Sequence, residues 1–223
     1  MPARTGQQYI DGLRAQEREV WLGGERVKDV TKHKGLAGGV KAIASLYDLQ
    51  HDPKLKKMMT YKSPSSGDRV GRSFSNPKTR EELEARTQMM LNWARTTNGM
   101  MGRSPDFMNV TFAAWGAAAD FFGEKKPEFG DNMRRYVEHL RENDVCLTHA
   151  LINLQRSRNV SGMFNLEEGT ALEVKKETSA GVVVHGARIL ATLGPLSDEI
   201  AVYSPRLARH SEKLIANGLC SSL

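Results

Sequence analysis

Apolar residues recur at helical spacing in several stretches of the first 150 residues, and this pattern predicts a mainly helical domain. The clearest stretches run from His33 to Leu49, from Thr79 to about Thr97, and from about Asp131 to Asn143. A short helix is also expected from Thr5, a residue type that caps helices, through Gln16.

The helix predicted to start after Thr79 carries the strongest terminal signal. Thr79 is a typical N-cap, and Glu82 stands three residues later, where a capping box places its second partner. Leu83, Met90 and Trp93 share one side of this helix, so we expect that side to be buried.

Shorter apolar runs bounded by glycines predict β-structure, first in one hairpin and then throughout the end of the chain. The segment from Val20 to Val27 is expected to form a hairpin whose two-residue turn is Gly23-Gly24. Further strands are expected at residues 172–177, 181–184 and 200–203.

Together these patterns indicate an α+β fold with a change of structure near residue 150. We expect a mainly helical domain over residues 1–150 and a partial β domain over residues 151–223. The chain has 223 residues, of which 39% are hydrophobic and 26% charged, and these fractions fit a globular protein with a real core.

The charge balance is mildly basic, with a net charge of +6, which raises the question of a nucleic-acid partner. The 32 lysines and arginines are interleaved with 26 acidic residues and form no basic arm, so we expect no nucleic acid. An anionic cofactor or an acidic substrate accounts for the excess equally well.

Neither a membrane span nor a disulfide framework is expected. No apolar run approaches the roughly 20 residues that span a membrane, and no signal-peptide pattern follows Met1. Cys146 and Cys220 do not form a C-x-x-C motif and fit reduced thiols, so we expect a cytoplasmic protein.

Two residues stand out as candidates for binding chemistry. Arg103 lies on a Gly-x-x-Pro turn, and His149 lies in an otherwise apolar segment. Both side chains donate hydrogen bonds, so together they could hold and polarise one phenolic oxygen. A surface arginine and a satisfied core histidine are the alternatives, which these residues alone leave open.

Other chemistries are less well supported. The Gln155–Arg158 segment fits a solvated loop or a pyrophosphate contact. Thr192 fits an ordinary strand end or a hydroxyl donor to a flavin. The sequence has no G-x-G-x-x-G opening a helix, no P-loop and no G-x-S-x-G motif. Its six histidines show no metal-binding spacing, so no metal site is expected.

Three segments together resemble one enzyme family. They are Met101–Asp106, Leu147–Asn153 followed by Gln155, and Gly186–Leu193. In order and spacing they are similar to the oxygenase components of 4-hydroxyphenylacetate 3-monooxygenases, which are two-component, flavin-dependent aromatic hydroxylases. The resemblance extends to about Ser211.

The resemblance implies an acyl-CoA-dehydrogenase-like fold, with an N-terminal helical domain, a β-barrel domain and a C-terminal helical bundle. It implies hydroxylation of a phenol to a catechol with O2 and reduced FAD, which a separate NAD(P)H-flavin reductase supplies as a diffusible co-substrate. It also implies a homo-oligomer, a tetramer in the family.

Site residues follow from the same resemblance. Arg103 and His149 match the positions that hold the phenolic oxygen, and Phe107 stands where the family usually has a tyrosine that also binds it. The matching flavin contacts are Gln155, Arg156, Ser157, Arg158 and Thr192.

The end of the chain departs from the family pattern. The residues up to Leu223 do not match the family's continuation, so we expect a truncated product that lacks the C-terminal bundle. An inactive remnant or an interaction module is therefore the competing hypothesis. A third hypothesis, a 4-hydroxybutyryl-CoA dehydratase-like lyase, requires an iron–sulfur cluster, for which two cysteines are too few.

Overall fold

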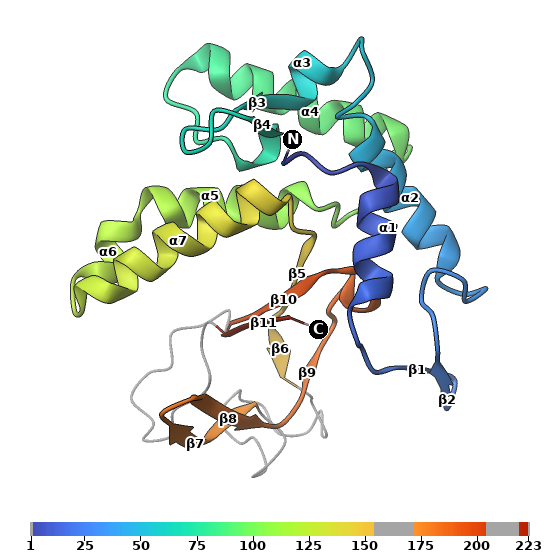
Figure 1. The fold of residues 1–223 in the computed structure, drawn as a ribbon, viewed down its shortest axis with the longest axis vertical. Coiled ribbons are helices and arrows are strands. Elements are labelled where there is room, and N and C mark those ends of the chain that lie inside the picture. The colour runs from blue at the N-terminus through green and yellow to red at the C-terminus, as the bar shows by residue number, and fades with distance from the viewer. Residues whose placement is uncertain (1, 154–171, 204–218, 223) are drawn as a thin grey trace, which may run out of the picture. The chain divides into compact units, whose positions relative to one another are not determined.

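The computed structural model describes residues 2–153, 172–203 and 219–222 (Figure 1). The chain forms two compact units, which are described separately. The first contains residues of Met1–Leu147 together with Pro195–Asp198, and the second contains residues of Thr148–Gly194 and Glu199–Ser222. The predicted domain boundary near residue 150 stays a prediction.

The start of the first unit agrees with the sequence. Helix α1 (Gly6–Ala15) has Thr5 as its N-cap, and a full capping box joins Thr5 to Gln8. The backbone N–H of Gln8 donates to Thr5 Oγ1 at 3.1 Å, and that of Thr5 donates to Gln8 Oε1 at 2.8 Å. The hairpin β1 (Val20–Leu22) and β2 (Glu25–Val27) confirms the predicted two-residue turn, whose two glycines both have positive φ.

The second predicted helix begins later than its apolar pattern suggested. Helix α2 runs over Ala37–Asp48, because the backbone N–H groups of Leu36 and Ala37 both bond to the carbonyl of His33 and form turns. Residues 59–75 contain a second hairpin. The elements of this region are α3 (Lys56–Met59), β3 (Thr60–Lys62), β4 (Arg69–Gly71) and the 3₁₀ turn η1 (Arg72–Phe74).

Helix α4 (Arg80–Thr96) confirms one half of its predicted cap and corrects the other. Thr79 accepts the backbone N–H of Glu82, but the Glu82 carboxylate accepts the N–H of Lys78, one residue before the cap. Leu83 is 49% exposed, so its predicted burial was wrong.

The buried side of α4 starts only at Met89, where the helix joins an apolar cluster. Trp93 also donates its indole N–H to the Leu46 carbonyl at 3.2 Å, which fixes α4 against α2. The cluster consists of Leu46, Met59, Met89 and Trp93.

Three further helices form an arm of the first unit in which α7 lies beside α5 and α6 (Figure 1). They are α5 (Asp106–Ala117), α6 (Ala119–Gly123) and α7 (Pro127–Asn143). Helix α7 starts four residues before the predicted Asp131, because Pro127 occupies the first turn, where a missing N–H costs nothing. A Cβ on Gly130 would stand 2.7 Å from the Ala119 carbonyl, so only glycine permits this approach of α6 and α7.

The second unit is built from short strands. The order β11–β10–β5 forms one sheet, from Leu219–Ser222, Glu199–Val202 and Leu147–Ala150. Strand β6 (Ile152–Asn153) pairs with β9 (Arg188–Ile189), and β7 (Glu173–Thr178) pairs with β8 (Gly181–His185). The three predicted strands are confirmed, and the described strands do not close into a barrel.

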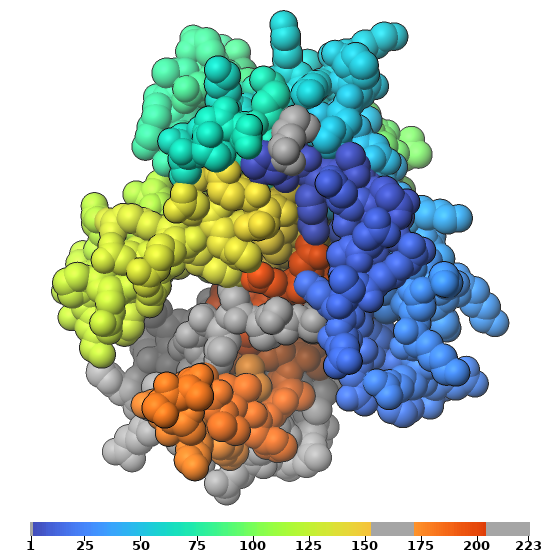
Figure 2. Space-filling model, viewed as in Figure 1, coloured from blue at the N-terminus to red at the C-terminus, as the bar shows by residue number. Residues whose placement is uncertain are grey.

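The hairpin β7–β8 presents apolar side chains to solvent. Val182, Val183 and Val184 are between 38% and 50% exposed, and the orange hairpin stands open on the face shown in Figure 2. None of the helices in the described part of the chain is long and apolar enough to cross a bilayer.

Candidate functional site

Arg103 lies on the turn that leads into α5, as its Gly-x-x-Pro context predicted. Its guanidinium carbon is 4.7 Å from the centre of the Phe107 ring, and Nη1 donates to the Gly102 carbonyl at 2.9 Å. Cation and ring are one helical turn apart, so the start of α5 sets their stacking. The Arg103 side chain is exposed, and it can therefore reach an oxygen of a bound molecule.

The same turn contains a carboxyl group that stabilises it. Ser104 donates its hydroxyl to the Asp106 carboxylate, and the backbone N–H of Phe107 donates to the Ser104 carbonyl at 3.1 Å. Burial raises the pKa of Asp106, and the Ser104 hydrogen bond opposes that rise. Ser104 and Asp106 therefore serve the turn that carries Arg103.

His149 lies in β5, where all four residues are buried. Its side chain is 7% exposed, and its ring centre is 6.3 Å from that of Tyr203, which follows β10. A donor held among buried neighbours keeps a fixed orientation.

Thr192 lies in a turn rather than at a strand end, and its side chain is exposed. A contact to β5 holds this turn in place: the backbone N–H of Leu193 donates to Thr148 Oγ1 at 3.3 Å. Thr148 is directly adjacent to His149, so one hydrogen bond connects the segments of two predicted site residues.

Leu190, two residues before Thr192, has an unusual backbone. Its φ is 66°, a left-handed conformation that costs a residue with a Cβ about 1–2 kcal/mol. Its side chain is nevertheless 68% exposed, so apolar burial does not offset this cost. Strain of this kind is concentrated at functional sites, and here it lies beside Thr192.

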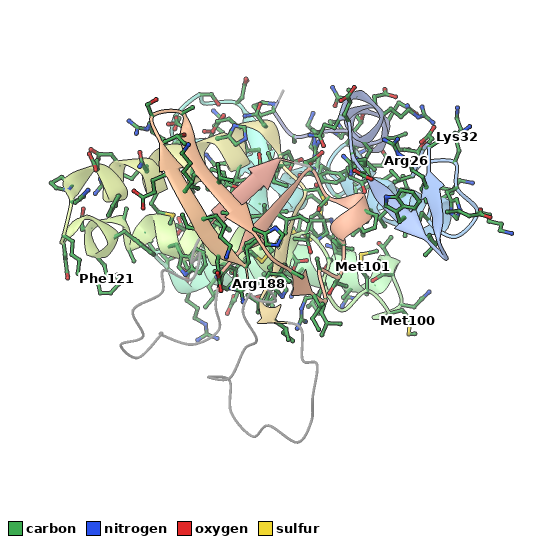
Figure 3. The ribbon with its side chains drawn as sticks, turned by 90° about the horizontal axis from the view of Figure 1, so that it is seen from below. Arg26, Lys32, Met100, Met101, Phe121 and Arg188 are labelled. Carbon is green, nitrogen blue, oxygen red and sulfur yellow. The ribbon has the colours of Figure 1, made fainter. Side chains whose placement is uncertain are left out.

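Arg188, on β9, is a polar residue of this region to which sequence reasoning gave no role (Figure 3). Its Nη1 donates to the Leu151 carbonyl at 3.0 Å. Its Nε and Nη2 are sealed from water and find no hydrogen-bond partner in the described structure. The motif Gly186–Leu193 contained Arg188, but no sequence pattern shows that its nitrogens are unpaired.

The structure brings the predicted residues together in pairs. Arg103 and Phe107 are stacked in the first unit, while His149 and Thr192 are linked through Thr148 and Leu193 in the second. The predicted flavin contacts Gln155, Arg156, Ser157 and Arg158 lie outside the described residues. Among the described residues, no group of three or more histidine, cysteine, aspartate or glutamate side chains could hold a metal ion.

The start of β5 is held by a buried polar network in the first unit. The Asp198 carboxylate accepts from Arg4 Nη2 at 2.6 Å and from the Cys146 backbone N–H at 2.7 Å. Asp144, the left-handed C-cap of α7, accepts the N–H of Arg4 and the side-chain amide of Gln50. Burial raises the pKa of Asp144, and Arg4 opposes that rise.

Comparison with known proteins identifies the family. Residues 5–218 match the family described as 4-hydroxyphenylacetate 3-hydroxylase N terminal. The chain belongs to this family.

Relatives from the hydroxylase family match nearly all of this chain. The 4-hydroxyphenylacetate 3-monooxygenase oxygenase component of Thermus thermophilus is 44% identical over 214 residues, which are 95% of this chain and 43% of that protein. This chain therefore spans less than half the length of that relative.

Solved structures confirm the acyl-CoA-dehydrogenase-like fold of the hydroxylase family. The oxygenase component complexed with FAD and 4-hydroxyphenylacetate has a TM-score of 0.89 and is 41% identical, over 99% of this chain and 45% of that one. The 4-hydroxybutyryl-CoA dehydratase of N. maritimus, with a TM-score of 0.77 over 91% of this chain and 40% of that one, is 20% identical and shares the fold alone.

Proposed function

We propose that this chain provides phenol and flavin contacts for an oxygenase component that hydroxylates a phenol, similar to 4-hydroxyphenylacetate, to a catechol. Membership of the hydroxylase family supports this function, and the observation that carries it is the exposed Arg103 stacked on Phe107. Arg103 and His149 would stabilise negative charge on the phenolic oxygen and so enrich electron density at the neighbouring ring carbon.

The described residues fit a flavin. Thr192 offers an exposed hydroxyl on a turn that Thr148 holds, and Arg188 has two N–H groups that need acceptors. When bound, reduced FAD would supply the electrons for splitting O2, of which one atom enters the ring and the other leaves as water. Gln155, Arg156, Ser157 and Arg158 are proposed as further flavin contacts from the family resemblance.

The proposal extends to partners and location. A separate NAD(P)H-flavin reductase would deliver the reduced FAD, and the oxygenase would act as a homo-oligomer in the cytoplasm. The Thermus relative is named an oxygenase component, which implies a second component. We also retain the division into a helical domain over residues 1–150 and a β domain over residues 151–223.

Catechol formation tests this function. The chain, and a chimera that joins it to the unmatched part of the Thermus relative, would receive reduced FAD and then O2 with a panel of phenols. We expect the chimera to release catechol. A chimera that binds reduced FAD but forms no catechol would exclude the hydroxylase activity and favour an inactive remnant.

Two substitutions test the assigned donors in the chimera. Arg103→Lys and His149→Gln should each lower kcat/KM about ten- to a hundredfold, because each weakens a hydrogen bond to a charged oxygen. Arg95→Lys and His139→Gln change exposed residues of the same types on α4 and α7, and they should have no effect.

A further inference from the structure

Part of the Arg188 guanidinium is shielded from water but has no hydrogen-bond acceptor in the described structure. It stands opposite Asn153 in the β6–β9 pair, and its Nη1 bonds to the Leu151 carbonyl at 3.0 Å. Its Nε and Nη2 have almost no contact with solvent and no partner among the described residues. A guanidinium carries five N–H donors, so one carbonyl leaves most of them unpaired.

No carboxylate in the described structure compensates this cation. Burial lowers the pKa of Arg188, and among the described residues no acidic group raises it in return. Buried donors without partners destabilise a fold, so each one calls for an explanation, of which a bound ligand is one. The unpaired Nε and Nη2 of Arg188 are therefore suited to bind an anionic group.

The position of Arg188 indicates which ligand this is. Its one bonded carbonyl, that of Leu151, is two residues beyond His149, and Thr192 follows Arg188 by four residues. The strained Leu190 stands between Arg188 and Thr192. Arg188 thus lies in the segment that carries the proposed flavin donor, and it is tied to the strand region that follows the proposed phenol donor.

We infer that Arg188 binds an anionic oxygen of the flavin through its Nε and Nη2, while Nη1 keeps it attached to the Leu151 carbonyl. This inference rests on the proposed function, because it requires a flavin at Thr192. The planar guanidinium suits a phosphate oxygen pair, and it suits equally the negative edge of a reduced isoalloxazine ring. In both cases the recognised group is an anionic oxygen.

Binding of three flavins distinguishes a phosphate oxygen from an oxygen of the isoalloxazine ring. Dissociation constants of reduced and oxidised FAD, FMN and riboflavin are measured anaerobically for the unaltered chain and for Arg188→Gln. We expect Arg188→Gln to weaken FAD binding about ten- to a hundredfold, the loss of a charge-assisted pair. A loss for FAD and FMN but not riboflavin would identify a phosphate oxygen. An equal loss for all three, larger for the reduced forms, would identify the ring.

Two further variants provide the comparison. Arg188→Lys keeps the charge without the planar fork and should retain part of the affinity. Lys176→Gln removes an exposed positive charge from β7 of the same unit and should bind every flavin like the unaltered chain.

Thermal unfolding gives a readout that does not depend on activity. Without flavin, Arg188→Gln should melt no lower than the unaltered chain, because it removes a partly buried cation with two unpaired nitrogens. With flavin, its rise in Tm should be smaller. If Arg188→Gln binds all flavins normally, or melts lower without flavin while binding normally, Arg188 is structural and the inference is wrong. If the unaltered chain binds none of the three flavins, the proposed function fails as well.

Discussion

Asp198 and Cys146 form a reciprocal pair: the backbone N–H of Asp198 donates to the Cys146 carbonyl at 2.8 Å, and the Asp198 carboxylate accepts the Cys146 N–H at 2.7 Å. The same carboxylate oxygen accepts from Arg4, so a charged pair closes the contact. Asp198 and Cys146 are buried, and the Arg4 side chain is 16% exposed. This arrangement fixes the chain three residues before His149.

Replacing Asp198 should therefore destabilise the first unit strongly. Asp198→Asn leaves the Arg4 guanidinium without its charged partner, and breaking one side of a buried pair costs about 3–5 kcal/mol. Urea unfolding followed by circular dichroism would measure the loss. The control is Asp11→Asn, since the exposed pair of Asp11 with Arg14 should contribute at most about 1 kcal/mol. Equal losses for both variants would contradict this account.

Cys146 should be unreactive in the folded protein. Burial first, and then the neighbouring Asp198 charge, raise the pKa of the Cys146 thiol to about 12, so almost no thiolate exists at pH 8. A chain carrying Cys220→Ser, with Cys146 as its one thiol, should resist a thiol reagent at pH 8 and react promptly in urea. Rapid labelling without urea would show that the chain just before β5 opens readily.

The raised pKa of Cys146 also has a consequence for stability. The folded state holds the thiol proton more tightly than the unfolded state does. Its contribution to the free energy of unfolding is therefore complete below the ordinary thiol pKa of about 9 and is lost as the pH rises toward 12. In the Cys220→Ser chain, a further Cys146→Ala substitution should flatten stability against pH in that interval. An unchanged slope would exclude the thiol as its source.

Leu190 should tolerate glycine better than alanine. At φ 66° a Cβ is strained, so Leu190→Gly should be more stable than Leu190→Ala by about 1 kcal/mol. At Val183, an exposed position on β8 whose φ is ordinary, the order should reverse by about 0.5–1 kcal/mol. Urea unfolding of the four variants checks this, and the same order at both positions would disprove strain at Leu190.

Phe107→Tyr should strengthen phenol binding if the proposed function holds. The substitution adds a hydroxyl on a ring that is 39% exposed and lies under Arg103, so one new hydrogen bond should lower the Kd about two- to tenfold. Fluorescence titration with a phenol would measure it. Phe129→Tyr is the matched control, because Phe129 also lies beside a cation, Lys126, but belongs to α7. Tighter binding by both variants would contradict a specific role for position 107.

Local signals explain most of what the sequence predicted correctly. Thr5 and Gly23-Gly24 act on their own neighbours, so the α1 cap and the β1–β2 turn were predictable without the rest of the chain. The prediction for Leu83 failed because burial depends on what packs against α4, where the buried residues are Met89 and Trp93.

The candidate site also divides into features with local sequence signals and features that depend on packing. Arg103 and His149 were proposed from residue type and context, and their roles stay a prediction. Strand β5 was not predicted as a strand, because its four buried residues lack the alternation that marks a half-exposed strand. No role for Arg188 followed from its motif, since its unpaired nitrogens depend on how β9 packs in the fold.

The first unit is completed by residues that are distant in sequence, and this constrains its synthesis. The Tyr9 hydroxyl donates to the Leu196 carbonyl at 2.6 Å, and Arg18 donates to the carbonyls of Pro195 and Ser197. On the ribosome, the helices of the first unit emerge long before these acceptors do. Tyr9, Arg18 and Arg4 therefore lack these hydrogen-bond acceptors until Asp198 has left the exit tunnel. A nascent chain paused earlier would be a substrate for chaperones rather than a finished unit.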